Sequence, residues 1–384
     1  MESEKKKKIT IVINGKFHAF DIAAELYKQK RLRMLISTYP RSIARKYGIG
    51  NEAFIGLPIF EVIKRLHRTI LRLLKIQEKD SWIHAAFPKV AKWFIPNDTD
   101  MLIGYTGNSL EIFESEKYKS IPKVLDKVST HTIANIELVS EAAKYHNIHW
   151  EPNSDAFIDR ELREYALADK ITVPSSYVLK TFTDNGVSPD KLLKIPYAIS
   201  MHKFAGLKEV NVKRENVVLF VGQISPRKGV GVLVKAMEVV RQTVPDAELW
   251  LVGGKYGGIQ DADLDYPWIT QWGILKGQDL YEKYKRASVF CLLSFEEGLA
   301  YVLTEALQCG LPIVATPNTG AEDLIDKGVN GFIVPLADHN AAAQNIINIL
   351  NSTEIWDIMD KSLKTTRNDL TWENYCNELL DKVK

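Results

Sequence analysis

The sequence lacks the features that mark secreted, membrane-spanning and metal-stabilised proteins. Its 384 residues contain only 3 cysteines, whose spacing fits neither a disulfide framework nor a metal site. No apolar run reaches the roughly 18 residues that a membrane-spanning helix needs. The charged N-terminus leads directly into an apolar strand, so we expect no secretory signal and a cytoplasmic location.

Motifs of several common ligand-binding proteins are also absent. No Gly-x-Gly-x-x-Gly follows the first apolar strand, which argues against a Rossmann dehydrogenase. No basic stripe interleaved with aromatic residues occurs, so nucleic acid is not an expected partner. The acidic run Asp261-Ala262-Asp263 lies in a polar loop, and we expect it to be solvated, with no metal site.

Length and composition are those of a globular chain with more than one core. A chain of 384 residues suggests two domains, and a composition of 46% hydrophobic and 26% charged residues is ordinary for globular proteins. The formal charge of +2 hides an asymmetry: residues 1–200 hold 31 Lys and Arg against 24 Asp and Glu (+7), and the remainder holds 19 against 24 (−5). This excess of positive charge is compatible with the first half of the chain approaching an anionic surface.

Apolar runs typical of buried parallel strands alternate with helical patterns in both halves. This alternation predicts an α/β protein with parallel sheets. The strands that we expect are Ile9–Ile13, Met34–Ser37, Met101–Tyr105, Lys123–Val128, Asp169–Ser175 (a strand and its turn), Val217–Val221, Leu249–Gly254, Ile269–Ile274, Val289–Leu293 and Leu311–Ala315.

The segment from Val289 to Val314 is the most informative part of the chain. An apolar strand ends at Ser294, an acidic loop follows, and a helical pattern begins near Tyr301. Glu297 lies at the strand end and Glu305 lies eight positions later on the helix. Because ligands of parallel sheets bind beyond the carboxyl ends of the strands, both carboxylates are candidates for binding a polyhydroxylated ligand that carries phosphate.

This segment resembles the E-x7-E motif of retaining glycosyltransferases of family 4. Those enzymes have the GT-B fold, in which two Rossmann-like domains face each other across a cleft. The resemblance implies that Glu305 holds the nucleotide ribose and that Glu297 contacts the transferred sugar. It also implies that backbone groups after Glu297 meet the sugar and diphosphate: Gly298, Leu299, Ala300 and Tyr301. Leu299-Ala300 stands where family members usually have Phe-Gly.

A basic loop, Gly222 to Gly229, follows the strand Val217–Val221 and precedes an apolar helix. Cationic side chains and glycines at a helix start form an anion site. The loop resembles the donor-phosphate loop of the family, and Lys228 matches its lysine. Gln223 stands where the family has an arginine, and Arg227 is the candidate to replace that cation.

Other site residues are implied mainly by the resemblance. Gly15, in the loop after the first strand, faces the donor diphosphate and the acceptor, and the nucleotide base rests near Gly273-Ile274. His131 matches the histidine beside the transferred sugar. We expect a histidine at a strand end to face the crevice, where its titration range suits a reactive site. His18 is the rival histidine.

The resemblance implies the domains and the activity as well. Residues 1–200 would form the acceptor-side domain, residues 201–365 the donor-side domain, and residues 366–384 a helix that crosses back to the first. The implied enzyme is a metal-independent, retaining hexosyltransferase that uses a UDP- or GDP-sugar as substrate and no cofactor. Its acceptor would be a hydroxyl of a glycan, a lipid-linked molecule or a small molecule. The alternative is a catalytically inactive GT-B protein that binds nucleotide sugars.

One helical pattern, over residues 57–75, has two readings. Its apolar residues recur at helical spacing, and five Lys or Arg residues lie between them: Lys64, Arg65, Arg68, Arg72 and Lys75. Either the apolar stripe packs on the protein's own sheet and the basic stems cover the outside, or the helix makes a peripheral contact with an anionic membrane or a lipid-linked acceptor.

Overall fold

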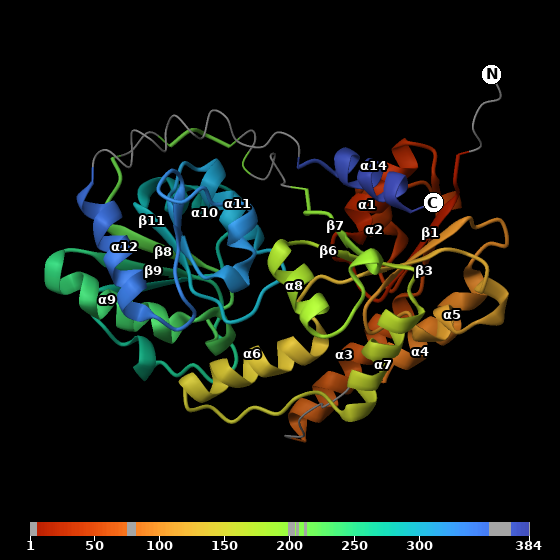
Figure 1. Cartoon of the computed structure of the whole chain (residues 1–384), viewed down its shortest axis with the longest axis horizontal. Coiled ribbons are helices and arrows are strands. Elements are labelled where there is room, and N and C mark those ends of the chain that lie inside the picture. The colour runs from red at the N-terminus through yellow and green to blue at the C-terminus, as the bar shows by residue number, and fades with distance from the viewer. Residues whose placement is uncertain are drawn as a thin grey trace.

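The computed structural model describes residues 6–74, 82–198, 204, 207–210, 213–352 and 370–383. Its strands form two separate parallel sheets, one from each half of the chain (Figure 1). Lys75 and part of the predicted domain boundary, residues 199–203, lie outside the described residues.

The first half forms a seven-stranded sheet in the order β3-β2-β1-β4-β5-β6-β7. β1 and β4 are buried along their whole length, which explains their continuous apolar sequence. The order reverses at β1, so the loops after β1 and β4 meet at a switch point where ligands of such sheets bind. The strands are β1 (Ile9–Ile13), β2 (Leu32–Ser37), β3 (Phe54–Gly56), β4 (Met101–Tyr105), β5 (Lys123–Asp126), β6 (Lys170–Val173) and β7 (Leu192–Lys194).

Helices connect the strands of this sheet, and two of them are capped by serines that the sequence places directly before them. Ser154 Oγ accepts from Phe157 N at the start of α7, and Ser175 Oγ accepts from Val178 N at the start of α8. The helices are α1 (Ala19–Lys28), α2 (Arg41–Lys46), α3 (Pro58–Leu73), α4 (Ile83–Ala91), α5 (Leu110–Phe113), α6 (Thr132–Tyr145), α7 (Asp155–Leu167) and α8 (Ser176–Asp184).

The second half forms a six-stranded sheet in the order β10-β9-β8-β11-β12-β13. Its switch point lies between β8 and β11, which pair in parallel. The elements are β8 (Val217–Val221), α9 (Val230–Thr243), β9 (Glu248–Val252), β10 (Ile269–Gly273), α10 (Gly277–Arg286), β11 (Val289–Leu292), α11 (Tyr301–Gln308), β12 (Ile313–Ala315), β13 (Gly331–Ile333) and α12 (His339–Asn351).

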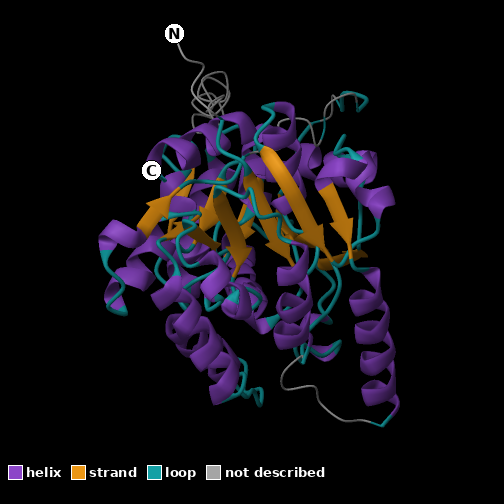
Figure 2. Cartoon of the chain, turned by 90° about the vertical axis from the view of Figure 1, so that its right-hand side faces the viewer, coloured by secondary structure: helices purple, strands orange, loops and turns teal. Residues whose placement is uncertain are grey.

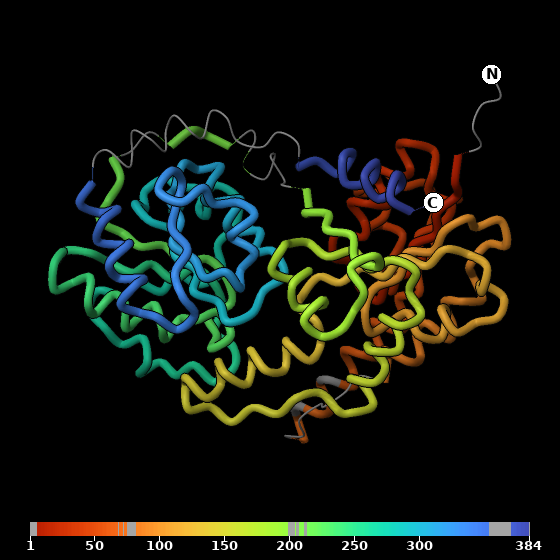
Figure 3. Tube along the Cα trace, viewed as in Figure 1, coloured from red at the N-terminus to blue at the C-terminus, as the bar shows by residue number. Residues whose placement is uncertain are grey.

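The last helix, α14 (Trp372–Lys382), returns to the first half of the chain and packs against α1 (Figure 3). Tyr375 on α14 is buried and donates its hydroxyl hydrogen to Asp126 Oδ2 at 3.1 Å, at the end of β5. The helix therefore contributes to the polar cluster at the carboxyl end of the first sheet.

Contacts between the two halves hold them against each other. Lys194 Nζ lies 2.8 Å from Asp323 Oδ1, and Ser176 Oγ donates to the same oxygen at 2.7 Å. Ser175 Oγ donates to the carbonyl of Gly298 at 2.7 Å. These bonds join the end of the first sheet to the loops of the second.

The strands expected from the sequence are present, with shifted ends.

The helix α3 decides between the two interpretations of the pattern over residues 57–75. Of the apolar residues in its stripe, only Phe60 is buried, and the others are exposed. The reading in which this stripe packs on the protein's own sheet is therefore wrong. Within the described ranges, no helix has the length and apolar character needed to cross a bilayer.

Candidate active site

The switch point of the second sheet brings together the two loops that the sequence singles out. The parallel pairing of Val289 with Val218 and Phe290 with Leu219 places the ends of β8 and β11 side by side. Beyond the strands, Phe295 N donates to Arg227 O at 2.8 Å. The basic loop after β8 and the acidic loop after β11 are thus neighbours, as a ligand site at the carboxyl ends requires.

Two cations and a carboxylate meet between these loops. Arg227 Nη1 lies 3.0 Å from Glu297 Oε1, and Lys228 Nζ makes an ion pair with the same oxygen. The Lys228 and Glu297 side chains are 12% and 13% exposed, so the pair is largely removed from water yet open on one side. A carboxylate here offsets the repulsion between the two cations.

Glu296, which the sequence analysis did not assign a role, ties this cluster to the first half of the chain. Its side chain is buried and accepts from Thr130 Oγ1 at 2.9 Å and Thr130 N at 3.2 Å. Arg227 Nη1 donates to Glu296 O at 2.7 Å and to its Oε2 at 3.2 Å. The only sequence signal for Glu296 was its position next to Glu297, and this position does not indicate that its distant partner is Thr130.

Two glycines allow the close approach of the backbones at the site. Gly229 has a φ of +68°, and a Cβ on it would lie 1.9 Å from the carbonyl oxygen of Leu293. A Cβ on Gly298 would lie 1.8 Å from the carbonyl oxygen of Val128, in the other half of the chain. Neither position has room for a larger residue without movement of the backbone.

Two buried hydroxyls near the cluster have no hydrogen-bond partner among the described residues. In contrast, the backbone N–H of Ala300, which we expected to meet the ligand, is already bonded to the protein. The buried hydroxyls of Ser225 and Ser294, in the loops after β8 and β11, make no hydrogen bond to the part of the chain that the structure describes. Ala300 N donates to Thr319 O at 3.1 Å. The N–H of Ala300 is therefore not directed at a ligand in this conformation.

Glu305 lies on α11, one turn into the helix that Tyr301 begins. Its carboxylate is 93% buried and its Oε2 accepts from the Tyr284 hydroxyl on α10 at 3.0 Å. Burial and the Glu305 carboxylate raise the pKa of Tyr284, so the phenol stays protonated and donates. Tyr284 thus orients Glu305, and no local sequence pattern indicated this partner.

The residues predicted to face the nucleotide lie at the carboxyl ends of β8, β9 and β10. Gly222 has a φ of +151° at the end of β8, and Gly273 has a φ of +64° at the end of β10. Gly273 O accepts from Gly253 N at 2.8 Å, which fixes the strand ends. The Ile274 side chain is exposed next to Gly254, where it offers an apolar surface.

His131 does not face an open cleft, which corrects the sequence expectation. It is the N-cap of α6, where its Nδ1 accepts from Ile133 N at 3.3 Å, and its ring packs on Tyr165 and Phe182. Burial, with Lys127 nearby, lowers its pKa to about 4, so the ring is neutral near pH 7. Helix capping by the imidazole overrode the tendency of strand-end residues to face the crevice.

The rival histidine, His18, follows the loop that contains Gly15. Gly15 has a φ of +124°, and its carbonyl accepts from Ser37 Oγ at 2.7 Å. His18 is buried, with Nε2 3.2 Å from Asp126 Oδ2 and its ring 4.3 Å from that of Tyr197. Tyr197 in turn stacks on Tyr301, at the start of α11. His18 is therefore linked through two aromatic rings to the loop after Glu297.

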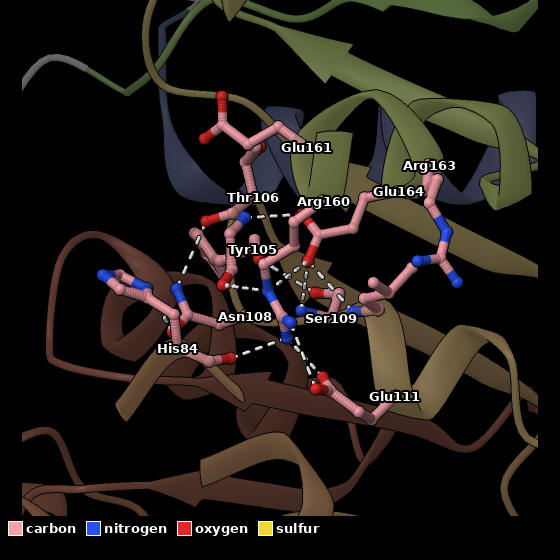
Figure 4. A network of polar contacts seen from close by, with 12 residues as sticks. His84, Tyr105, Thr106, Asn108, Ser109, Glu111, Arg160, Glu161, Arg163 and Glu164 are labelled. Atoms are coloured by element: carbon pink, nitrogen blue, oxygen red, sulfur yellow. Dashed lines mark hydrogen bonds and ion pairs between the residues drawn. The ribbon is translucent and has the colours of Figure 1, made fainter. Parts of the chain in front are cut away.

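A buried polar network supports the loop after β4 (Figure 4). Glu164 accepts from the backbone N–H groups of Gly107, Ser109 and Leu110 at 2.5 to 3.0 Å, and burial raises its pKa to about 7. In the same loop, Asn108 Oδ1 accepts from Asn14 Nδ2 at 3.1 Å. The network thereby fixes the two loops at the switch point of the first sheet.

Among the described residues, no group of three or more His, Cys, Asp or Glu is placed to hold a metal ion. The cysteines of this part of the chain, Cys291, Cys309 and Cys376, are buried and reduced.

Comparison with known proteins finds a family match in the second half of the chain. Residues 215–352 match the model of a family described as glycosyl transferases group 1. D-inositol 3-phosphate glycosyltransferase of Pseudarthrobacter chlorophenolicus is 29% identical over 204 residues, which cover 48% of this chain and 48% of that protein. Capsular polysaccharide biosynthesis glycosyltransferase CapM of Staphylococcus aureus is 24% identical over 319 residues, or 81% of this chain and 75% of CapM. The chain spans about half the length of the first curated relatives that it matches.

Solved structures show that the fold extends over the whole chain. A mutant of S. aureus TarM, in complex with fondaparinux, alpha-GlcNAc-glycerol and UDP, has a TM-score of 0.67 and 12% identity over 98% of this chain and 100% of TarM. The two sheets, with their helices and the returning α14, are the GT-B fold that the sequence predicted.

The neutral state of His131 leads to a prediction about stability and pH. Its pKa is lower in the folded protein than the ordinary value of 6.5, so the unfolded chain binds more protons below that pH, and stability falls as the pH falls from about 6.5 toward 4. Asn can cap a helix but does not titrate. Between about pH 7 and pH 5, we expect wild type to lose about 2 kcal/mol more unfolding free energy than His131→Asn.

Urea denaturation at the two pH values measures this difference. The exposed His149 provides the control, since His149→Asn should follow wild type. Equal pH dependence in wild type and His131→Asn would show that His131 titrates normally in the folded protein.

Proposed function

Since residues 215–352 form a glycosyl transferases group 1 domain, we propose that this chain is a glycosyltransferase that moves a sugar from a nucleoside diphosphate to an acceptor hydroxyl. The observation that carries the proposal is the ion cluster of Arg227, Lys228 and Glu297 at the switch point of the second sheet. It combines cations for a diphosphate with a carboxylate for sugar hydroxyls.

The cations would act on the leaving group. Breaking the bond between the sugar and the diphosphate builds negative charge on the phosphate oxygens, and Lys228 and Arg227 would stabilise that charge. The unpartnered hydroxyls of Ser225 and Ser294 lie in the same loops and would donate to phosphate oxygens. Because these groups supply the neutralising charge, the proposed reaction uses no metal and no cofactor.

Glu297 would exchange partners when the donor binds. Without a ligand, its carboxylate accepts from both cations. A diphosphate competes for the same cations, and the carboxylate is then available to sugar hydroxyls at the adjacent position. Glu305, oriented by Tyr284, would bind the ribose and set the position of the donor.

Retention of the anomeric configuration is part of the proposal. No carboxylate is assigned as a nucleophile, so the acceptor would attack on the face from which the diphosphate leaves, through an ion-pair-like transition state. The donor would be a UDP- or GDP-hexose, and the acceptor a glycan, a lipid-linked molecule or a small molecule. We also propose that the enzyme works in the cytoplasm.

Release of nucleoside diphosphate from a panel of UDP- and GDP-sugars, with a chelator present, tests the activity. Turnover that survives chelation supports the proposal. Donor binding without turnover under any condition would favour the alternative, an inactive protein that binds nucleotide sugars.

Replacing Lys228 tests the role of the cations. Lys228→Ala removes a contact to the leaving group and should reduce kcat/KM by about 100-fold or more. Lys180→Ala, at an exposed lysine on α8, is the matched control and should leave the rate unchanged. A Lys228→Ala rate within a few-fold of wild type would remove Lys228 from the mechanism.

Replacing Glu305 tests the ribose contact. Gln can still accept from the Tyr284 hydroxyl, so Glu305→Gln should fold normally. It loses the charge that strengthens hydrogen bonds to ribose hydroxyls, and the Kd for the free nucleoside diphosphate should rise roughly tenfold or more. Titration calorimetry measures the Kd, and an unchanged value would contradict the assignment.

A further inference from the structure

The exposed side of α3 carries large apolar residues where a surface helix normally carries polar ones. Ile59, Val62, Ile63, Leu66, Ile70 and Leu73 recur every three or four residues, so they share one face of the helix. All of them are 40% to 78% exposed. We call these six residues the α3 face.

A side of the helix next to this face attaches it to the protein. Phe60 is buried, and its ring lies 5.7 Å from that of Phe87 on α4. Lys64 lies on the half-buried side, 3.6 Å from Glu61. The orientation of α3 is therefore fixed, with the apolar stripe outward, and the helix lies at the lower edge of the molecule, where it projects past the sheets (Figures 1 and 2).

Exposed aromatic residues lie on the segments that follow α3 in the chain. Trp82, before α4, is 40% exposed, and its ring lies 6.5 Å from that of Phe60. Two further exposed aromatics, Trp93 and Phe94, follow α4. Tryptophan combines a large apolar ring with an N–H that prefers a polar partner, and this combination favours the boundary between lipid and water.

Positive charge is concentrated in the same segment. Residues 58–94 contain 8 Lys and Arg against 3 Asp and Glu, a net charge of +5, whereas the whole chain carries +2. Arg65 is exposed on α3, and Lys89 is exposed on α4. A covering partner must therefore be both apolar and anionic.

We infer that the α3 face, together with Trp82, docks on the surface of an anionic lipid bilayer. A continuous apolar stripe of this kind is unfavourable in water and marks an interaction site. A second copy of this chain would bring two positively charged segments together, which electrostatic repulsion opposes. An anionic bilayer satisfies both requirements, since the apolar residues enter the acyl boundary while the cations stay among the headgroups.

Docking would place the enzyme where a lipid-linked acceptor is found. α3 belongs to the half of the chain that contains the acceptor-side loops, including Gly15, and not to the half that carries Lys228 and Glu297. The assignment of a lipid-linked acceptor rests on the proposed function, whereas the binding of α3 to a bilayer does not.

Co-sedimentation with vesicles tests the docking, with no donor present. The full chain should sediment with vesicles of equimolar phosphatidylcholine and phosphatidylglycerol at low salt, less so at high salt, and not with pure phosphatidylcholine. Leu66→Gln with Ile70→Gln changes two exposed residues and should lower the partition coefficient by about tenfold or more. Arg65→Gln with Arg68→Gln should weaken binding to anionic vesicles at low salt only.

Two controls make the result specific. Leu162→Gln with Leu167→Gln changes exposed apolar residues on α7 and should sediment as wild type. Nucleoside diphosphate release without vesicles should be the same for wild type and the Leu66, Ile70 variant. If wild type releases no nucleoside diphosphate from any donor, that result contradicts the proposed function but not the docking.

Three results would overturn the docking. In the first, wild type does not sediment with anionic vesicles at low salt, and in the second, the Leu66, Ile70 variant sediments as much as wild type does. The third result is a wild-type dimer in sedimentation velocity that the Leu66, Ile70 variant does not form. The last would show that a second copy covers the α3 face.

Discussion

The pairing of Glu297 with Arg227 and Lys228 is the interaction on which the rest of the site depends. Two adjacent cations in a half-enclosed loop repel each other and lose hydration, and a shared carboxylate offsets both costs. The carboxylate comes from the loop after β11, and the two cations come from the loop after β8. The two ion pairs therefore also join these strand ends at the switch point. The same charges that hold these loops together are those that a nucleotide sugar would use.

Glu296 extends this constraint to the other half of the chain. It shares Arg227 with Glu297 and accepts from Thr130, while Gly298 allows the backbone of Val128 to approach. The donor loop therefore packs directly on the loop that contains His131. On the far side of that loop, the cluster of His18, Asp126 and Tyr375 brings α14 and the first sheet together. The proposed donor site is thus built on both halves, although its charged groups belong to the second.

The sequence was sufficient where the signal is local. Continuous apolar runs identified the long central strands. Lys228 and Glu297, which the sequence singled out at the ends of two of these strands, form an ion pair in the structure. The strands β3, β7 and β13 have three residues each and were missed, because so few residues show no periodicity. β12 is equally short but lies in the longer predicted run Leu311–Ala315.

Contacts between distant residues could not be predicted in the same way. The bonds from Thr130 to Glu296 and from Tyr284 to Glu305 depend on how the chain folds back, which no motif encodes. His131 was expected to face the crevice, yet its role as a helix cap turns the ring onto Tyr165 and Phe182. For α3, the helical period showed that one face is apolar but not that this face points to solvent.

Hydrogen exchange with and without a nucleoside diphosphate tests the central claim, that the β8 and β11 loops hold the donor. We predict that a bound nucleoside diphosphate slows amide exchange in residues 222–230 and 297–305, and leaves α3 unchanged. Binding that protects only the first half of the chain, with no change in these two loops, would contradict the claim.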